Sequence, residues 1–360
     1  MLARTSVLTS IVLASLRDLQ WRSRRFLLAA VATGLVFGLA LMMSGVANSF
    51  SVEVRNTVAA VGAETWLVRT GSSGPFSAPA PFPLSEASVV AGVPGVVAEA
   101  TLFVGRAVSS GPAGETNVNV LGVVPGGLGS PAVVRGAALT GNGGVVADVS
   151  LGDKVGQTVL LNSSRFTVIG LVNGVTYFAG QPVVFMSMRA ADRLDASGLP
   201  LATAILVKGA PKRPVPGFTA LSDAQVRSDL GRPTTQAAKT IKLIEILLWI
   251  VAAGIIAAIL YLSALERRND FAVLKAVGAP GWHLFLGLVL QAVVMALGAV
   301  VIGVVVEAII APTSAMAVRV SAGDYAAVPI VAVAGGVLAS IVPARRAAAV
   351  DPSLAFGGGK

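Results

Sequence analysis

Four long apolar stretches constrain the fold of this chain more than any other feature of its sequence. They cover residues 26–48, 243–265, 284–311 and 325–342. A helix that crosses a bilayer needs about 20 mostly apolar residues, and each stretch meets or nearly meets that length. Of the 360 residues, 54% are apolar and only 12% are charged, which is outside the range of an ordinary soluble domain. The sequence therefore predicts a membrane protein with four spanning helices.

The second stretch carries an acid, Glu245, near one end. Its Leu, Ile and Val residues favour insertion by roughly 4 to 7 kcal/mol, whereas one acid costs about 3 kcal/mol even at the centre of a helix. We therefore expect this stretch to insert.

The first stretch is predicted to be an uncleaved anchor. A secretory signal has a short basic region and an apolar core of about 7 to 15 residues, whereas here about 25 residues precede a much longer apolar run. Cleavage after small residues such as Gly45 or Ala47 is the alternative.

Within residues 1–25, apolar side chains recur at helical spacing at Leu8, Ile11, Val12, Leu16 and Leu19. This pattern favours an amphipathic helix in the cytoplasmic interface, with a simple extension of the first span as the alternative for its last turn.

The basic residues orient the chain. They precede the first span, lie between spans two and three, and follow span four: Arg4, Arg17, Arg22, Arg24 and Arg25; Arg267, Arg268 and Lys275; Arg345, Arg346 and Lys360. All three groups lie on one side if every apolar stretch crosses once, and short basic segments mark the cytoplasmic side. We therefore expect both termini in the cytoplasm of a cell (inner or plasma) membrane. The net charge of +9 then needs no nucleic-acid partner.

Residues 49–241 separate the first two spans and are expected outside as an α+β domain of roughly 190 residues. Short β-rich runs recur there between Gly and Pro turn signals: 65–69, 100–108, 117–124, 157–161, 165–171, 182–186 and 202–208. Helices are expected over residues 85–91, 188–194 and 222–230. The run 162–164, NSS, predicts a hairpin turn. The low-complexity run 71–81, GSSGPFSAPAP, predicts a mobile surface loop.

Between spans two and three, residues 266–283 form an unusually charged segment. Phe271, Leu274 and Val277 recur every three residues, which places them on one side of a short helix. Gly278 and the proline two residues later are placed to end that helix. Such an amphipathic element, joined at both ends to spanning helices, is able to transmit force. A solvated positive-inside loop is the alternative.

Three motifs resemble those of FtsX-like, MacB-type permease subunits of ABC transporters. The first is ERRNDFAVLKAVGA at residues 266–279, which departs from the family pattern at Asp270, where Glu is usual. The second is PARRAAAVDPSLA at residues 343–355, with alanine in place of the usual last leucine. The third comprises VVAD, LGDKVGQTVL and FTVIG at residues 145–148, 151–160 and 166–170. The order of parts also matches, and the size of the domain is nearer to the exporter branches, including the DevC-like group.

The resemblance implies that residues 266–283 form a coupling helix and turn, which dock in a groove of a cytoplasmic ABC ATPase dimer. Phe271, Leu274 and Val277 would fill the groove, and Gly278 would end the helix. Four charged residues would fix the register: Glu266, Arg267, Asp270 and Lys275. Tail contacts are expected at Arg345, Arg346, Asp351 and Pro352 of the cytoplasmic segment 343–360. A second copy or a related permease, an external adaptor or hydrolase, and membrane lipids are the other expected partners.

No catalytic, cofactor or metal site is expected in the chain. No G-x-x-x-x-G-K-[ST] phosphate loop occurs, so ATP and Mg²⁺ would be bound by the partner ATPase. His283, the single histidine, lies beside a tryptophan at a membrane boundary and is read as an interfacial residue. Glu245, Gln291 and Glu307 are candidate polar groups within the membrane. The two acids are expected near the outer ends of their helices, either extending to the interface or contacting cargo or a partner.

Two functions fit the sequence. The first is a permease that couples ATP hydrolysis in a separate subunit to the export or extraction of an amphipathic or lipid-linked substrate, by transmitting force to its external domain. The second is an ATP-driven regulator or sensor that controls an external partner such as a cell-wall hydrolase, without transport. The size of the external domain favours the first.

Overall fold

The computed structural model describes residues 23–111, 114–141, 143–194, 200–266, 272–273, 281–314 and 317–348. The chain divides into two compact units, Met1–Asn48 with Lys239–Lys360, and Ser49–Ala238. We call the first the helical unit and the second the sheet unit. The expected amphipathic helix over residues 1–25 lies almost wholly outside the described residues.

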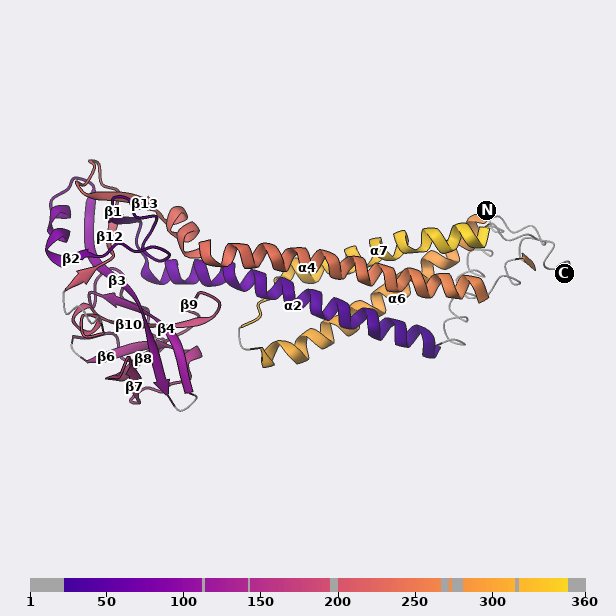
Figure 1. Cartoon of the computed structure of the whole chain (residues 1–360), viewed down its shortest axis with the longest axis horizontal. Coiled ribbons are helices and arrows are strands. Elements are labelled where there is room, and N and C mark those ends of the chain that lie inside the picture. Colours follow the sequence, from indigo (N-terminus) through magenta and orange to yellow (C-terminus); the bar gives the residue numbers. More distant parts are fainter. Residues whose placement is uncertain are drawn as a thin grey trace. The chain divides into compact units, whose positions relative to one another are not determined.

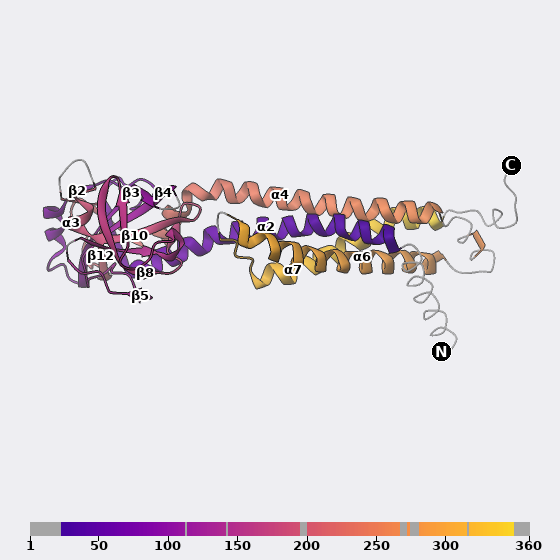
Figure 2. The ribbon, with the colours of Figure 1, turned by 90° about the horizontal axis from the view of Figure 1, so that it is seen from below.

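Four helices are long and apolar enough to cross a membrane in the described part of the chain: α2 (Ser23–Val61), α4 (Asp223–Glu266), α6 (Gly281–Ile310) and α7 (Ala322–Ala348). Their parts in the helical unit run side by side (Figures 1 and 2). Many of their apolar side chains face outward, among them Ile309 at 67% exposed and Ile330 at 70%. Outward apolar side chains of this kind are expected where the surrounding solvent is lipid.

All four helices extend past at least one of the ends that hydropathy predicts; α6 begins at Gly281, inside the expected coupling segment, rather than at residue 284. The apolar stretch ends at residue 48, but α2 continues to Val61, because no helix breaker occurs before Gly62, which adopts φ +67°. The expected helix over 222–230 and the second span are one helix, α4, which contains Pro233. The fourth span begins at Ala322 rather than 325 and includes Pro343, which was assigned to the tail. Hydropathy marks the apolar window of a helix and not its ends.

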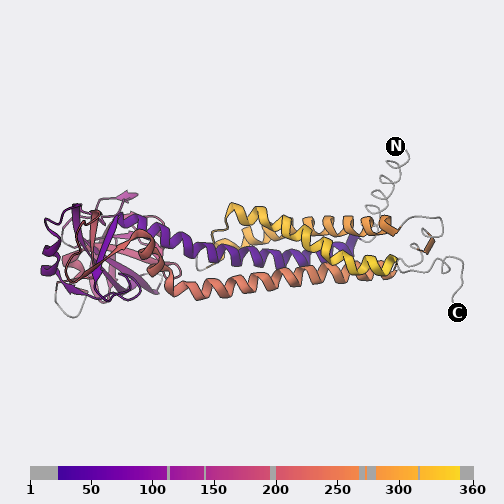
Figure 3. The same cartoon turned by 90° about the horizontal axis from the view of Figure 1, so that it is seen from above.

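Close backbone contact joins α2 to α6 inside the helical unit. A Cβ atom added to Gly34 would lie 2.6 Å from Ile302, and one added to Gly303 would lie 2.9 Å from the Cβ atom of Phe37. Phe37 itself is 1% exposed and packs against Trp249 of α4 in a tilted arrangement, with ring centroids 5.2 Å apart. Small residues at this contact let the two helices approach closely, as in other membrane bundles (Figure 3).

The sheet unit is an α+β domain, as expected. Its strands are β1 (Thr65–Arg69), β2 (Phe82–Pro83), β3 (Val96–Gly111), β4 (Gly114–Val123), β5 (Arg135–Gly136), β6 (Gly144–Asp148), β7 (Thr158–Leu161), β8 (Ser164–Val172), β9 (Thr176–Tyr177), β10 (Gln181–Ser187), β11 (Leu201–Ala202), β12 (Ala204–Gly209) and β13 (Phe218–Ser222). The short helices are η1 (Leu84–Val90), η2 (Val149–Leu151) and α3 (Met188–Ala191), and η3 (Ala311–Thr313) belongs to the helical unit.

Most of the strands form one mixed sheet in the order β13-β1-β12-β3-β4-β10-β6-β8-β5, with β7 on β3 and β8. The pairs β4–β10 and β6–β8 are parallel, and the others are antiparallel. The predicted hairpin is confirmed: Leu161 pairs with Ser164, and both Asn162 and Ser163 have positive φ, the conformation of a type I′ turn. Strand β9 pairs with β10 in the same sheet, and the remaining two strands, β2 and β11, pair with each other.

The expected mobile loop over residues 71–81 is instead fixed to the core. Phe76 is 3% exposed and packs against the rings of Trp66 and Tyr177. The backbone N–H groups of Phe76 and Ser77 donate hydrogen bonds of 2.9 and 3.2 Å to the Oδ2 atom of Asp229, in the first turns of α4. Composition suggested a solvated loop, but one aromatic residue and a distant carboxylate hold it in place.

Candidate functional site

Most of the predicted ATPase-coupling segment lies outside the described residues: Arg267, Asp270, Phe271, Leu274, Lys275, Val277 and Gly278. Within the described part, Glu266 is exposed at the end of α4, Ala272 is buried and Val273 is half exposed. In the predicted tail, Arg345 is exposed near the end of α7, and Arg346 belongs to the same helix. Asp351 and Pro352 lie outside the described residues.

The three predicted intramembrane polar residues are all buried in the structure. Glu245 is 9% exposed on α4, Glu307 is 5% exposed near the end of α6, and Gln291 is 1% exposed in the middle of α6. Each acid hydrogen-bonds a side chain of the same chain: Glu245 bonds Lys242 and Glu307 bonds Tyr325. Their expected places near the outer ends of the membrane spans stay a prediction. The structure does not bring Gln291 into the pocket that Glu245 lines.

Glu245 pairs with Lys242, one turn earlier on α4. The Nζ atom of Lys242 lies 3.0 Å from each carboxylate oxygen, and the lysine side chain is 64% exposed, whereas that of Glu245 is 11% exposed. The spacing of three residues on a helix places the two groups on one face. Lys242 thus neutralises an acid that would otherwise be buried among apolar groups.

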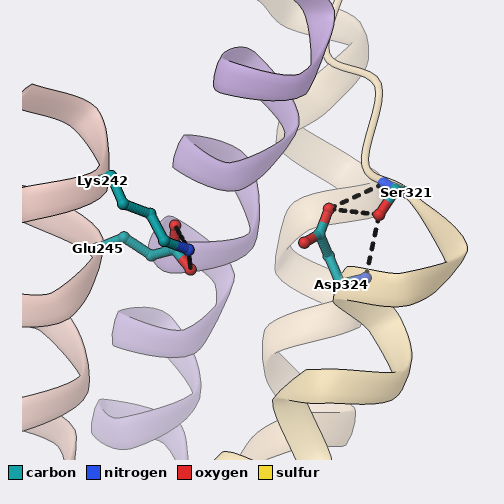
Figure 4. A network of polar contacts seen from close by, with 4 residues as sticks. All are labelled: Lys242, Glu245, Ser321 and Asp324. Atoms are coloured by element: carbon teal, nitrogen blue, oxygen red, sulfur yellow. Dashed lines mark hydrogen bonds and ion pairs between the residues drawn. The ribbon is translucent and has the colours of Figure 1, made fainter. Parts of the chain in front are cut away.

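Asp324 lies in the first turn of helix α7 and forms a second polar group with Ser321 (Figure 4). Its Oδ2 atom accepts hydrogen bonds from the backbone N–H of Ser321 at 3.1 Å and from the Ser321 hydroxyl at 2.7 Å. In return, the backbone N–H of Asp324 donates to the Ser321 hydroxyl at 3.1 Å. This reciprocal pattern is a capping box, which satisfies donors that the first turn of a helix leaves open. Ser44 of α2 lines the same pocket as Asp324.

A pocket of about 470 Å³ connects these polar groups. Lys242 and Glu245 line it from α4, Asp324 from α7 and Ser44 from α2, and all four belong to the helical unit. The other lining residues are apolar: Ala40, Leu41, Ile246, Trp249, Ile250, Ala253, Ala327, Val328, Val331, Ala334, Gly335 and Leu338. The site thus combines a small charged cluster with an extended apolar wall.

Sequence reasoning missed Asp324, Lys242 and Ser44 as members of this site. The apolar stretches at 284–311 and 325–342 predict a short external loop over residues 312–324, which includes Asp324. The run SAGD at residues 321–324 carries the S-x-x-D spacing of a capping box and marks the start of a helix, so this signal was present. Nothing in the sequence indicates that Ser44 and Asp324, 280 positions apart, would line one pocket.

The VVAD motif has a structural role in the sheet unit. Residues 144–148 form strand β6, and its last residue, Asp148, is 1% exposed and caps the start of η2. Its two carboxylate oxygens accept hydrogen bonds from the backbone N–H groups of Ser150 and Val175, at 2.9 and 2.7 Å. Asp148 therefore holds two loops together. Among the described residues, no group of His, Asp or Glu side chains is arranged to hold a metal ion.

Comparison with known proteins places this arrangement in a family. Residues 26–218 match the MacB-like periplasmic core domain, and residues 243–352 match the FtsX-like permease C-terminal domain. An uncharacterized ABC transporter permease of Mycobacterium tuberculosis strain H37Rv is 40% identical over 346 residues, covering 96% of this chain and 99% of its own. Another, from Mycobacterium bovis, is 38% identical over 345 residues, with the same coverage.

Two solved structures resemble the chain more distantly. The periplasmic region of MacB from Actinobacillus actinomycetemcomitans matches with a TM-score of 0.36 and 14% identity, covering 49% of this chain and 96% of that one. The extracellular domain of the noncanonic ABC-type transporter YknZ from Gram-positive bacteria matches with a TM-score of 0.33 and 14% identity, covering 42% and 85%.

The sequence matches span both units and nearly the whole length of the relatives. This chain belongs to the FtsX-like, MacB-type family of ABC transporter permeases.

Proposed function

We propose that the chain is the membrane subunit of a transporter in which a separate cytoplasmic ATPase, with its own ATP and Mg²⁺, drives export or extraction of an amphipathic or lipid-linked substrate. The sheet unit would lie outside the cell membrane, and both termini would lie in the cytoplasm. One observation carries the proposal: the family match over residues 243–352 includes the short amphipathic segment between spans two and three. The sequence of that segment repeats apolar residues every three positions between charged ones, the pattern expected of a helix that docks on another protein.

The transporter would contain two copies of this chain, or one copy and a related permease, on an ATPase dimer. Four spanning helices are too few to enclose a conventional pathway within one subunit. Movement of the coupling segment would instead displace the spans and the domain that they carry. An amphipathic substrate is supported by the pocket of the helical unit, which offers charged and apolar walls side by side.

Leu274→Asp tests the coupling segment. A carboxylate in place of a groove-filling leucine should abolish co-purification of the cytoplasmic ABC ATPase, while the protein still inserts and elutes as wild type on size exclusion. Val273→Asp is the matched control, because Val273 lies one position away and off the three-residue repeat. Loss of the ATPase in both variants, or in neither, would contradict the docking role of Leu274.

Reconstitution of the complex distinguishes a transporter from a regulator, because the two functions give different measurable results. For transport, reconstituted complexes should release amphipathic substrate in an ATP-dependent manner, with no hydrolase present. If the complex released no substrate but its sheet unit bound and activated a cell-wall hydrolase, the regulator would replace the transporter.

A further inference from the structure

The pocket of the helical unit has two chemically different regions. Lys242, Glu245, Asp324 and Ser44 form the polar region, where α2, α4 and α7 contribute one or two residues each. From Asp324 the apolar wall follows α7 to Leu338, a distance of roughly 21 Å at about 1.5 Å per residue. That length exceeds half of the ~30 Å hydrocarbon core of a bilayer. The wall is thus long enough for the tail of an amphiphile that occupies one leaflet.

The apolar wall is open to its surroundings. Ile250 on α4 is 62% exposed and Leu338 on α7 is 66% exposed, although both line the pocket. A molecule could therefore enter from the side, between α4 and α7, without crossing the polar region. Trp249 lies on the same wall and supplies a broad apolar surface.

The polar region carries a net negative charge. Lys242 and Glu245 neutralise each other through contacts of 3.0 Å, which leaves the carboxylate of Asp324 as the excess charge. Asp324 forms no ion pair with a lysine or arginine within 4.0 Å among the described residues, although the charge of Lys242 also acts on it, and its side-chain hydrogen bonds come from Ser321. Such a region favours a headgroup that donates hydrogen bonds or carries positive charge, and disfavours an anionic one.

We propose that this pocket binds a membrane amphiphile whose headgroup carries an ammonium group, with the headgroup at Asp324 and Glu245 and a hydrocarbon chain along the α4–α7 wall. The proposal rests on the proposed function, since it gives the permease a site for an amphipathic substrate. Charge complementarity at Asp324, together with the length of the apolar wall, selects this occupant over a second copy of the chain.

Quenching of tryptophan fluorescence tests the proposal directly. The full-length permease, without ATPase or nucleotide, is titrated in detergent with phosphatidylethanolamine that carries brominated chains. The fluorescence contributed by Trp249 is obtained by subtracting the fluorescence of the Trp249→Phe variant from that of the wild type. We expect saturable quenching of that signal, with roughly tenfold weaker binding for brominated phosphatidylglycerol, the loss expected when a charge-assisted hydrogen bond is replaced by repulsion.

Two variants locate the ligand. Ala334→Phe should abolish saturable quenching, because Ala334 lines the wall and a larger side chain would fill it. Ala326→Phe is the control on the same helix, since Ala326 is exposed and does not line the pocket. Asp324→Asn should remove the preference between the two lipids, and Glu245→Gln, which leaves the helix cap intact, should weaken it.

Quenching that does not saturate, that is equal for both lipids, or that survives Ala334→Phe would overturn the proposal. A second copy on this wall would make Ile250→Cys form a disulfide-linked dimer that lipid does not prevent; because the chain has no native cysteine, that result also overturns it. Failure here leaves the ATPase test at Leu274 unaffected. Conversely, the protein could bind the lipid as expected while the Leu274→Asp variant still co-purifies with the ATPase. That pair of results would contradict the proposed coupling segment and support the lipid site.

Discussion

The hydroxyl of Tyr325 donates a hydrogen bond of 2.8 Å to the Oε2 atom of Glu307. This bond links the end of α6 to the first turn of α7, and Glu307 is only 5% exposed. Tyr325→Phe would leave a buried carboxylate without this donor. We expect a loss of about 1 to 3 kcal/mol in the free energy of unfolding, measured in detergent by thermal or denaturant unfolding.

A double-mutant cycle with Glu307→Gln isolates the interaction. If the bond between the two side chains matters, Tyr325→Phe should cost less in the Glu307→Gln background than in wild type. Equal costs in both backgrounds would show that the tyrosine acts through packing alone.

Two glycines of α6 make a matched pair. A Cβ atom at Gly303 would lie 2.9 Å from the Cβ atom of Phe37 and 3.0 Å from the backbone of Gly38, whereas one at Gly298 would meet nothing within 4 Å. Gly303→Ala should destabilise the protein by about 1 to 3 kcal/mol, because α2 must shift. Gly298→Ala should be neutral or stabilising by up to about 1 kcal/mol, because alanine favours the helix. Unfolding midpoints that ranked the two variants in the opposite order would disprove the close contact.

Asp229 is expected to fix the 71–81 loop. Asp229→Ala removes the acceptor for the N–H groups of Phe76 and Ser77, and should cost about 1 to 3 kcal/mol. Limited proteolysis of the full chain should then cut within residues 71–81 at a higher rate. Asp223→Ala on the same helix is the control: its pair with Arg227 is more than one-third exposed, so we expect no comparable change. Unchanged cleavage in Asp229→Ala would refute the anchoring role.

Asp153 gives a pH-dependent prediction. Burial raises the pKa of this carboxyl, so the folded state disfavours its ionised form relative to the unfolded chain. The unfavourable term is therefore present at neutral pH and disappears as the pH falls below the usual range of an aspartate. Asp153→Asn should raise the unfolding midpoint at pH 7, and the gain over wild type should shrink as the pH falls toward about 3.5. A gain that is constant with pH would contradict this assignment.

Local chemistry made much of the fold predictable. The strand at residues 65–69 and the Asn162-Ser163 hairpin follow from patterns that a few neighbouring residues determine. Hydropathy located the four spans because a bilayer imposes the same requirement on each helix. The family motifs identified the class of protein, since they occur in the same order at matching places in the chain.

The rest depended on contacts between distant parts of the sequence. In the sequence, Phe76 is a single aromatic residue in a glycine- and proline-rich loop. Only the structure shows that its backbone N–H binds Asp229, 153 positions away. Lys242 and Asp324 likewise carry no sign that they line one pocket. The capping box at Ser321 was legible, but hydropathy drew the helix boundary three residues too late.

The same capping box has a consequence for recognition. Two hydrogen bonds from Ser321 hold the Asp324 carboxylate in one orientation before a ligand binds. The side chain of Lys242, in contrast, is long, flexible and 64% exposed. Ordering a side chain when a ligand binds costs free energy. The Asp324 carboxylate avoids that cost because the capping box already fixes it. Discrimination at this end of the cavity would therefore come from a rigid acceptor, with the mobile lysine adapting to whatever lies beside it.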